Sequence, residues 1–207
     1  MKKNICCLLF TVSGVALVFA QEGPASDPMA WQFNAHANLY FIPEDFFILP
    51  VFQADKNKLH LEARYNYEDR KTFSAWIGYN FHGGIKLEYT LTPMLGGVVG
   101  RSDGIAPGLE ITLNFKGFEL YSESEVYLDM QSEENRYFYN WTDLTYSPKD
   151  WLWFGISGQR TRTYQTRLDV QRGILIGTGV KNWEFTTYAY NLGFEDPFVL
   201  VSISKQF

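Results

Sequence analysis

The chain has 207 residues, of which 23 are acidic and 18 basic, and its formal charge is −5 at pH 7. Aromatic residues make up 17% of it and charged residues only 20%. This length suits one β domain, the lack of a long apolar run beyond the N-terminus argues against a helical membrane protein, and the acidic balance argues against a nucleic-acid partner.

The first twenty residues have the layout of a secretory signal peptide. Lys2 and Lys3 precede an apolar run that ends in the small residue Ala20. A transmembrane anchor is the alternative, although the run is short for a span. We predict cleavage after Ala20, which removes the only two cysteines, Cys6 and Cys7. The mature chain then has 16 basic and 23 acidic residues and no disulfide, and we predict no cofactor.

Residues 21–30 are expected to form a flexible lead, and from Trp31 to Phe207 apolar and polar residues alternate in segments broken by short turn signals. This period of two indicates β-strands. The fifth segment contains Pro93 and Gly96-Gly97, which favour a break, so two shorter strands are an alternative there. Twelve strands are predicted, at 31–42, 46–55, 58–68, 71–82, 85–100, 104–115, 117–128, 135–146, 150–163, 167–180, 182–192 and 197–206.

The two faces of these strands differ in chemistry. One face is apolar and uncharged, whereas the other carries ionisable groups in mid-strand, as Glu62 and Arg64 do. A soluble β-sandwich also alternates, but its aromatic residues tend to lie in the core. Here aromatic residues gather toward strand ends, which is typical of girdles at two membrane interfaces. The predicted girdle pairs are Tyr65 with Tyr67, Tyr79 with Phe81, Tyr137 with Tyr139, and Trp151 with Trp153.

A bilayer excludes open sheet edges, because each unpaired backbone group in hydrocarbon costs several kcal/mol. Residues 31–207 are therefore predicted to form an all-β, 12-stranded antiparallel up-and-down transmembrane β-barrel, in which the last strand pairs with the first. Turns at 55–58, 82–84, 116–117, 147–150 and 181–182 are expected in the periplasm with both chain ends. The more acidic loops at 43–45, 68–70, 101–103, 131–135, 164–166 and 194–196 are expected outside.

The final segment, PFVLVSISKQF, resembles the C-terminal strand of bacterial outer-membrane proteins. Those strands end in an aromatic residue preceded by apolar residues at alternate positions, and Val199, Val201, Ile203 and Phe207 fit this pattern. Lys205 departs from it. The resemblance implies that periplasmic outer-membrane assembly machinery recognises this strand.

The body of the chain resembles an uncharacterised family of Gram-negative outer-membrane barrels. This resemblance implies a bacterial outer-membrane location, a lipid bilayer as partner and a porin-like barrel, and it implies no reaction. The segments that carry it cover most of residues 58–191 and are LHLEARYNYEDRKT, WIGYNF, TPMLGGVVG, FELYSESE, FYNWTDLTYSP, QRTRTYQT and FTTYAYN.

If the apolar faces meet lipid, the lumen of the barrel collects rows of charge. Glu119, Glu123 and Glu125 share one strand face, and we expect Arg160 and Arg162 to pair with them. The row could instead hold a hard cation such as Ca²⁺, but an ion-paired row is favoured, so no metal is predicted. The predicted lumen residues are Glu62, Arg64, Lys86, Glu88, Glu119, Glu123, Glu125, Arg160, Arg162 and Glu184.

The leading functional prediction is a narrow channel for small polar solutes or ions. A barrel with a closed lumen and a structural or interaction role is the second possibility. A lipid acyl-chain enzyme is the third, because some outer-membrane barrels carry a serine activated by histidine. The mature chain offers only His36, His60 and His82 and no His-x-Ser or Gly-x-Ser-x-Gly motif, so we predict that it is not an enzyme.

Overall fold

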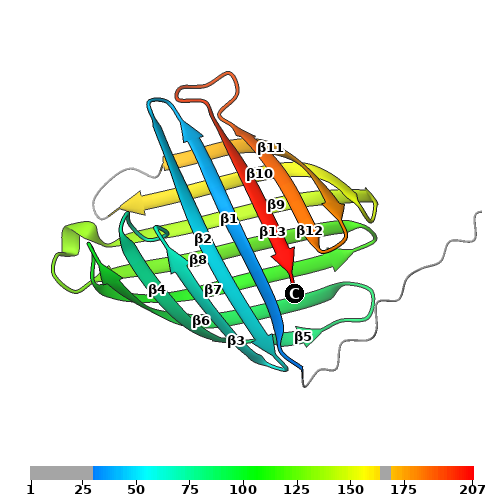
Figure 1. The fold of residues 1–207 in the computed structure, drawn as a ribbon, viewed down its shortest axis with the longest axis horizontal. Helices are drawn as coiled ribbons and strands as arrows, with labels where there is room; N and C mark the ends of the chain where they lie inside the picture. The colour runs from blue at the N-terminus through cyan, green and yellow to red at the C-terminus, as the bar shows by residue number, and fades with distance from the viewer. Residues whose placement is uncertain (1–29, 164–168) are drawn as a thin grey trace, which may run out of the picture.

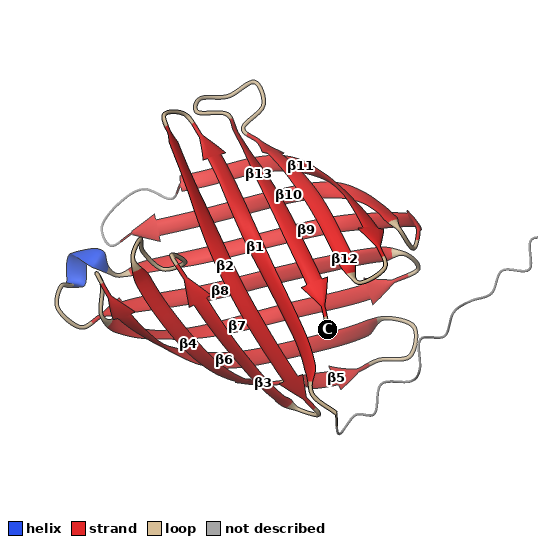
Figure 2. Ribbon diagram, viewed as in Figure 1, coloured by secondary structure: helices blue, strands red, loops and turns tan. Residues whose placement is uncertain are grey.

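The computed structural model describes residues 30–163 and 169–207, so the predicted signal peptide and residues 21–29 of the lead lie outside the described residues. The described chain forms one antiparallel sheet of thirteen strands with a single short helix, η1 (Glu133–Asn135) (Figures 1 and 2). No helix in these two ranges is long and apolar enough to cross a membrane. The strands are β1 (Gln32–Ile42), β2 (Asp45–Lys56), β3 (Leu59–Tyr65), β4 (Thr72–Tyr79), β5 (Phe81–Gly83), β6 (Glu88–Gly100), β7 (Gly104–Phe115), β8 (Phe118–Asp129), β9 (Tyr137–Lys149), β10 (Leu152–Thr163), β11 (Asp169–Val180), β12 (Trp183–Tyr190) and β13 (Phe198–Gln206).

The thirteen strand segments form twelve barrel strands, called staves below. β4 and β5 are separated only by Asn80, and both pair with β6, so together they make the single strand predicted at 71–82. Each stave pairs with its neighbours along the chain, and β1 pairs with β13, which closes the sheet. The predicted 12-stranded antiparallel barrel is therefore confirmed.

Most of the predicted strand bounds differ from the observed ones by one to three residues, and two of the differences affect the lumen. β6 runs unbroken through Pro93, which pairs with Leu109, so this region is one strand and not two, while residues 85–87 lie before it. β3 ends at Tyr65 instead of continuing to residue 68. Residues 66–71 leave the wall there, because Asn66 has a positive φ of 60° and its side chain bonds the Ile48 carbonyl at 3.0 Å.

The seam between β1 and β13 joins the first and last strands of the barrel (Figure 1). Asn34 pairs with Gln206, and the Phe207 amide donates to the Phe33 carbonyl at 3.0 Å. This end of the barrel, which also carries the turns at 57–58, 116–117 and 181–182, is called the inner end below. The opposite end, with η1 and the loop between β12 and β13, is called the outer end.

The outside of the barrel is an apolar wall. Its strand positions leave large side chains open, for example Ile77 at 58%, Leu95 at 53% and Ile176 at 58% exposure. Aromatic rings pack against one another at both ends of the wall. The ring centroids of Phe118 and Tyr146 lie 4.8 Å apart at the inner end, and those of Phe41 and Phe46 lie 5.0 Å apart at the outer end. A wall of this kind buries its apolar surface only in a bilayer, which is the arrangement of transmembrane barrels.

Four of the eight predicted girdle residues face the lumen and not the lipid. Tyr65, Tyr79 and Phe81 do face outward. Trp151 is also exposed, at 56%. The other four pack into the lumen because the barrel interior must be filled, and the hydroxyls of Tyr67 and Tyr137 donate to Glu123 and Glu125 there. The inward-facing residues of the predicted pairs are Tyr67, Tyr137, Tyr139 and Trp153.

Candidate functional site

A buried arginine lies at the centre of the lumen. Arg64, on β3, is 1% exposed, and its Nε donates to Glu62 Oε1 at 2.6 Å. Its Nη1 reaches across the lumen to β8 and donates to Glu123 Oε1 at 2.6 Å and to Glu125 Oε2 at 3.4 Å. Glu110, on β7, lies 3.9 Å from Nη2. One guanidinium therefore faces four carboxylates.

Aromatic rings enclose the same guanidinium. Its carbon lies 4.2 Å from the centre of the Tyr67 ring and 4.4 Å from that of Trp76. Cation–π attraction is strong where water is excluded. Arg64 is thus fixed by charge and by aromatic packing, and it ties the β3 wall to the opposite wall.

The segment 66–71 bends inward above this arginine. The Tyr67 hydroxyl donates to Glu123 Oε2 at 2.7 Å, and the Tyr67 ring meets Tyr139 edge-on at 6.0 Å. Tyr137, on the opposite wall, donates to the Glu68 carbonyl at 3.1 Å. The segment is therefore bonded to β8 and β9 across the lumen and narrows it.

A large cavity lies toward each end of the lumen, and a smaller one of about 560 Å³ lies at the inner end beside His60 and Asn80. The inner cavity has a volume of about 730 Å³ and the outer cavity about 1300 Å³. Among the described residues, Tyr67 alone lines both, so the constriction around Tyr67 separates them.

The inner cavity is strongly acidic. Eight carboxylate side chains line it, against two lysines and His36. Because the cavity lies inside a wall of low dielectric, these charges act over longer distances than they would in water. The acidic residues are Glu62, Glu88, Glu110, Glu119, Glu123, Asp143, Asp150 and Glu184, and the lysines are Lys86 and Lys116.

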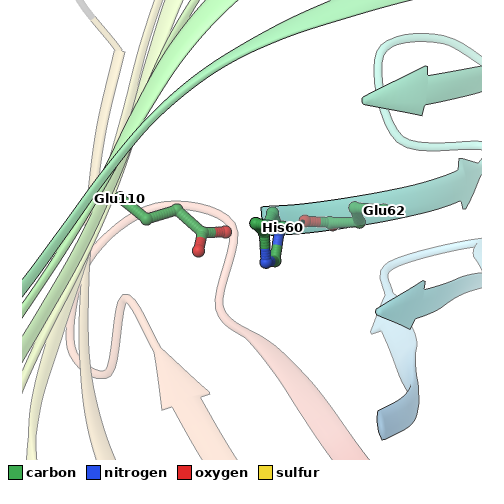
Figure 3. Close-up of side chains that lie close together, drawn as sticks. All are labelled: His60, Glu62 and Glu110. Carbon is green, nitrogen blue, oxygen red and sulfur yellow. Dashed lines mark hydrogen bonds and ion pairs between the residues drawn. The ribbon is translucent and has the colours of Figure 1, made fainter. Parts of the chain in front are cut away.

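His60, Glu62 and Glu110 form the group that could hold a metal ion. Each offers a ligand atom within 4.8 Å of the others, and Glu110 on β7 points across the lumen toward His60 and Glu62 on β3 (Figure 3). His60 also contacts Asp55 through Nδ1 at 2.9 Å and Glu62 through Nε2 at 3.3 Å. Nitrogen and carboxylate oxygen together suit a divalent transition metal.

The predicted lumen residues fall into three groups in the structure. Glu62, Arg64, Glu123 and Glu125 meet at the centre. The residues that lie at the inner cavity are Lys86, Glu88, Glu119 and Glu184.

The third group is Arg160 and Arg162 on β10, and the lumen prediction is wrong for Arg160. Arg160 lies on the same face of β10 as Ile156 and Phe154, which are 59% and 48% exposed, so it faces the outside of the barrel. It bonds Asn140 and not the glutamate row, whose actual partner is Arg64. The Arg162 side chain lies outside the described part of the molecule.

Sequence reasoning missed several lumen residues. Glu110 alternates with the apolar residues Leu109 and Ile111, which was a usable signal. Asp143 was harder to find, because its face of β9 also carries Tyr139 and Trp141. Asp143 accepts hydrogen bonds from Trp141 at 2.6 Å and from Tyr188 at 3.0 Å, so it lies inside the barrel.

Two of the three histidines have hydrogen-bond partners other than serine. His60 contacts Asp55 and Glu62, and His82 contacts Thr90 at 3.0 Å. In residues 30–163 and 169–207, no recorded hydrogen bond joins a histidine to a serine hydroxyl. His60 and His82 are thus bonded to other groups, while His36 lies opposite Ser204 across the β1–β13 seam.

The last strand carries its lysine on the outer wall. Val199 is 41% exposed and Lys205 lies on the same face. The Lys205 ammonium lies 5.0 Å from the Trp183 ring centre and 4.5 Å from that of Phe207. The departure from the apolar pattern is thus accommodated by two aromatic rings at the inner rim.

The barrel is similar to solved outer-membrane porins. The KdgM porin gives a TM-score of 0.58 at 11% identity, with 85% of this chain and 99% of that chain covered. The KdgM porin in complex with disordered oligogalacturonate gives 0.61 with the same identity and coverage. The outer membrane protein Omp33 of Acinetobacter baumannii gives 0.50 at 10% identity, covering 87% and 100%. No protein-family model and no curated protein sequence matches the chain.

At these identities the likeness shows the fold. The fold is that of a bacterial outer-membrane porin, in agreement with the resemblance noted from the sequence.

Proposed function

We propose that this protein is a narrow channel of the bacterial outer membrane that passes small polar solutes or ions and favours cations. The acidic inner cavity carries the proposal, since its lining holds eight carboxylates and two lysines. Rows of like charge in a confined pore attract counter-ions and repel ions of the same sign. Removal of a signal peptide near Ala20 precedes membrane insertion in this proposal.

The centre of the lumen supports the same preference. Arg64 supplies one positive charge to Glu62, Glu110, Glu123 and Glu125. A buried excess of carboxylate is costly unless protons or cations balance it. Cations that enter the inner cavity would meet this group next.

The constriction limits the size of the solute. Tyr67 separates the two cavities and is held by Glu123 and Tyr139. A solute must therefore be small or must displace segment 66–71. A polyanion such as the oligogalacturonate bound by the KdgM porin is disfavoured here, because like charge inside a low-dielectric cavity repels it.

Planar-bilayer recordings under a KCl gradient test the proposal. The wild type is expected to give discrete steps with a reversal potential on the cation side. Replacing both Glu119 and Glu184 by Lys changes the cavity charge by four units, so the preference should fall or invert. Glu134→Lys is the control, because Glu134 lies exposed on η1, outside both cavities. Anion preference in the wild type would contradict the proposal.

A closed barrel with a structural or interaction role is the second candidate. It is favoured by the contacts that cross the lumen from β3 and segment 66–71 to β8 and β9. Folded protein that gives no conductance in the same recordings would establish this candidate instead.

Recognition of β13 by outer-membrane assembly machinery is also part of the proposal. Its support is the alternation of Val199, Val201 and Ile203 on the outer wall and the terminal Phe207, which is 65% exposed.

A further inference from the structure

A polar strip crosses the otherwise apolar outer wall on β8, β9 and β10. Its members lie on the same strand faces as exposed apolar residues. On β9, for example, Phe138 is 38% and Leu144 41% exposed. Ser124 pairs with Asn140, and Asn140 pairs with Arg160, so the strip runs across three neighbouring strands. The strip, called the wall strip below, consists of Ser122, Ser124, Asn140, Thr142 and Arg160.

Hydrogen bonds give the wall strip a fixed shape. Asn140 Nδ2 donates to Ser124 Oγ at 3.0 Å, to Ser122 Oγ at 3.1 Å and to the Glu123 carbonyl at 2.8 Å. Asn140 Oδ1 accepts from Thr142 Oγ1 at 3.2 Å and from Arg160 Nη2 at 2.8 Å. Asn140 is only 4% exposed, so it acts as a buried anchor that positions the exposed guanidinium of Arg160.

A second arginine lies next to this guanidinium. Arg160 pairs with Val170, and Arg172 stands two residues further along β11, in the diagonal position. Diagonal neighbours on one sheet face lie about 7–8 Å apart, within reach of long side chains. Arg172 is exposed and lies on the same face of β11 as the exposed residues Ile174 and Ile176. Its guanidinium carbon lies 5.7 Å from the centre of the Phe194 ring.

Among the described residues, neither Arg160 nor Arg172 forms an ion pair. Arg172 also borders the rim of the outer cavity, whose lining includes Glu195 and Asp196. None of the lipid-facing positions of the described strands carries Asp or Glu. An arginine on the lipid face destabilises a barrel most at the bilayer midplane and much less near an interface. Two neighbouring arginines on such a wall repel each other, and an anion bound between them would relieve this repulsion.

We propose that the wall strip with Arg172 binds the phosphate of an anionic lipid in the outer leaflet of the membrane. Arg160 stands three residues before Thr163, the outer end of β10, which is about 10 Å along the strand and so close to the headgroups. Guanidinium groups bind phosphate with two parallel hydrogen bonds.

A second copy of the chain fits this surface less well. A two-fold contact would bring arginines from both copies together, and the lipid-facing strand positions offer no acid to pair with them. The inference rests on the membrane position of the barrel, and it is independent of whether the lumen conducts.

Native mass spectrometry of the detergent-folded protein tests the proposal, with bisphosphorylated lipid A as the probe. The wild type is expected to bind it, and Arg160→Gln and Arg172→Gln should each bind about tenfold more weakly, because a charged hydrogen-bonding partner is lost. Arg70→Gln is the matched control, since Arg70 is a rim arginine already paired with Asp45. Heat-modifiability on gels confirms that each variant is folded.

Four results would overturn the proposal. Equal affinity of the wild type and both arginine variants would remove the strip from the binding site. Equal binding of lipid A stripped of its phosphates would show that the acyl chains are recognised. A dimer that dissociates in Arg160→Gln, with lipid A binding unchanged, would assign the strip to a second copy of the chain. Binding of free inorganic phosphate in place of lipid A would assign the strip to an ion site.

Discussion

Arg64 shows how a single residue can organise the interior of this barrel. Its charge is surrounded by carboxylates of three strands and enclosed by two aromatic rings. A buried ion pair contributes little net stability compared with apolar packing, but removing one partner leaves charges buried without compensation. The glutamates around Arg64 therefore depend on it more than it depends on any one of them.

Replacing Arg64 by Ala should lower the free energy of unfolding by about 3–5 kcal/mol or prevent folding, since Glu62, Glu123 and Glu125 would then repel one another without a cation. Urea titration in phosphatidylcholine vesicles, followed by tryptophan fluorescence, measures the change. The control is Arg70→Ala, because its pair with Asp45 is exposed to solvent and contributes little to stability. Equal losses in the two variants would contradict a structural role for the Arg64 cluster.

The sequence predicts which residues share a strand face more readily than it predicts their partners. Glu62 and Arg64 alternate cleanly with Leu61 and Ala63, so their common face was accessible from the pattern. The contact of Arg64 with Glu123 joins β3 to β8 across the lumen. It depends on how a closed sheet curves, and no local pattern encodes that.

Segment 66–71 is the element that sets the width of the lumen. It connects β3 to β4, and it carries Tyr67 and Glu68 into contact with the opposite wall. Both cavities end at Tyr67, so its side chain is the structural boundary between them.

Tyr67→Ala should join the cavities and raise the single-channel conductance, because the variant loses the ring that meets Tyr139 and the hydroxyl that bonds Glu123. Tyr65→Ala is the matched control, since Tyr65 lies two residues earlier and is 43% exposed on the lipid face. Planar-bilayer recordings give the comparison. An unchanged conductance in Tyr67→Ala would place the constriction elsewhere.

β9 and β10 show where the alternation of polar and apolar residues misleads. On these strands the lumen face carries Tyr139 and Trp141, while the lipid face carries Asn140 and Arg160. At these four positions the usual chemistry of the two faces is exchanged, so the polar–apolar pattern assigns Arg160 to the lumen. The exchange is possible because Asn140 satisfies the polar groups of the outer face locally and Asp143 satisfies the aromatic donors inside.

At the scale of the whole molecule, the fold follows from the requirement that no strand edge meet hydrocarbon. Twelve staves with short turns, an apolar wall and a polar interior were all readable from period-two alternation. The strand bounds near residues 66–71 and 85–87 were not, because there tertiary contacts override a pattern that continues as if for a strand.

A chain that ends at Asp196 should fail to form the barrel, because β1 and β12 would then present two open edges to lipid. The expected result is loss of the heat-modifiable folded band on detergent gels. Phe207→Ala keeps β13 and its pairs with β1, so this control should retain the band. A folded band from the shortened chain would show that the seam is dispensable.

The seam also sets the order of events during folding. Asn34 and Ser204 are hydrogen-bonded although 170 positions separate them, so the pair forms only after nearly the whole chain has been made. Contacts of such long range make folding slow. Until β13 arrives, the free edge of β1 has to stay in water or be covered by another protein. For this barrel, closure and entry into the bilayer are therefore expected to be one concerted step.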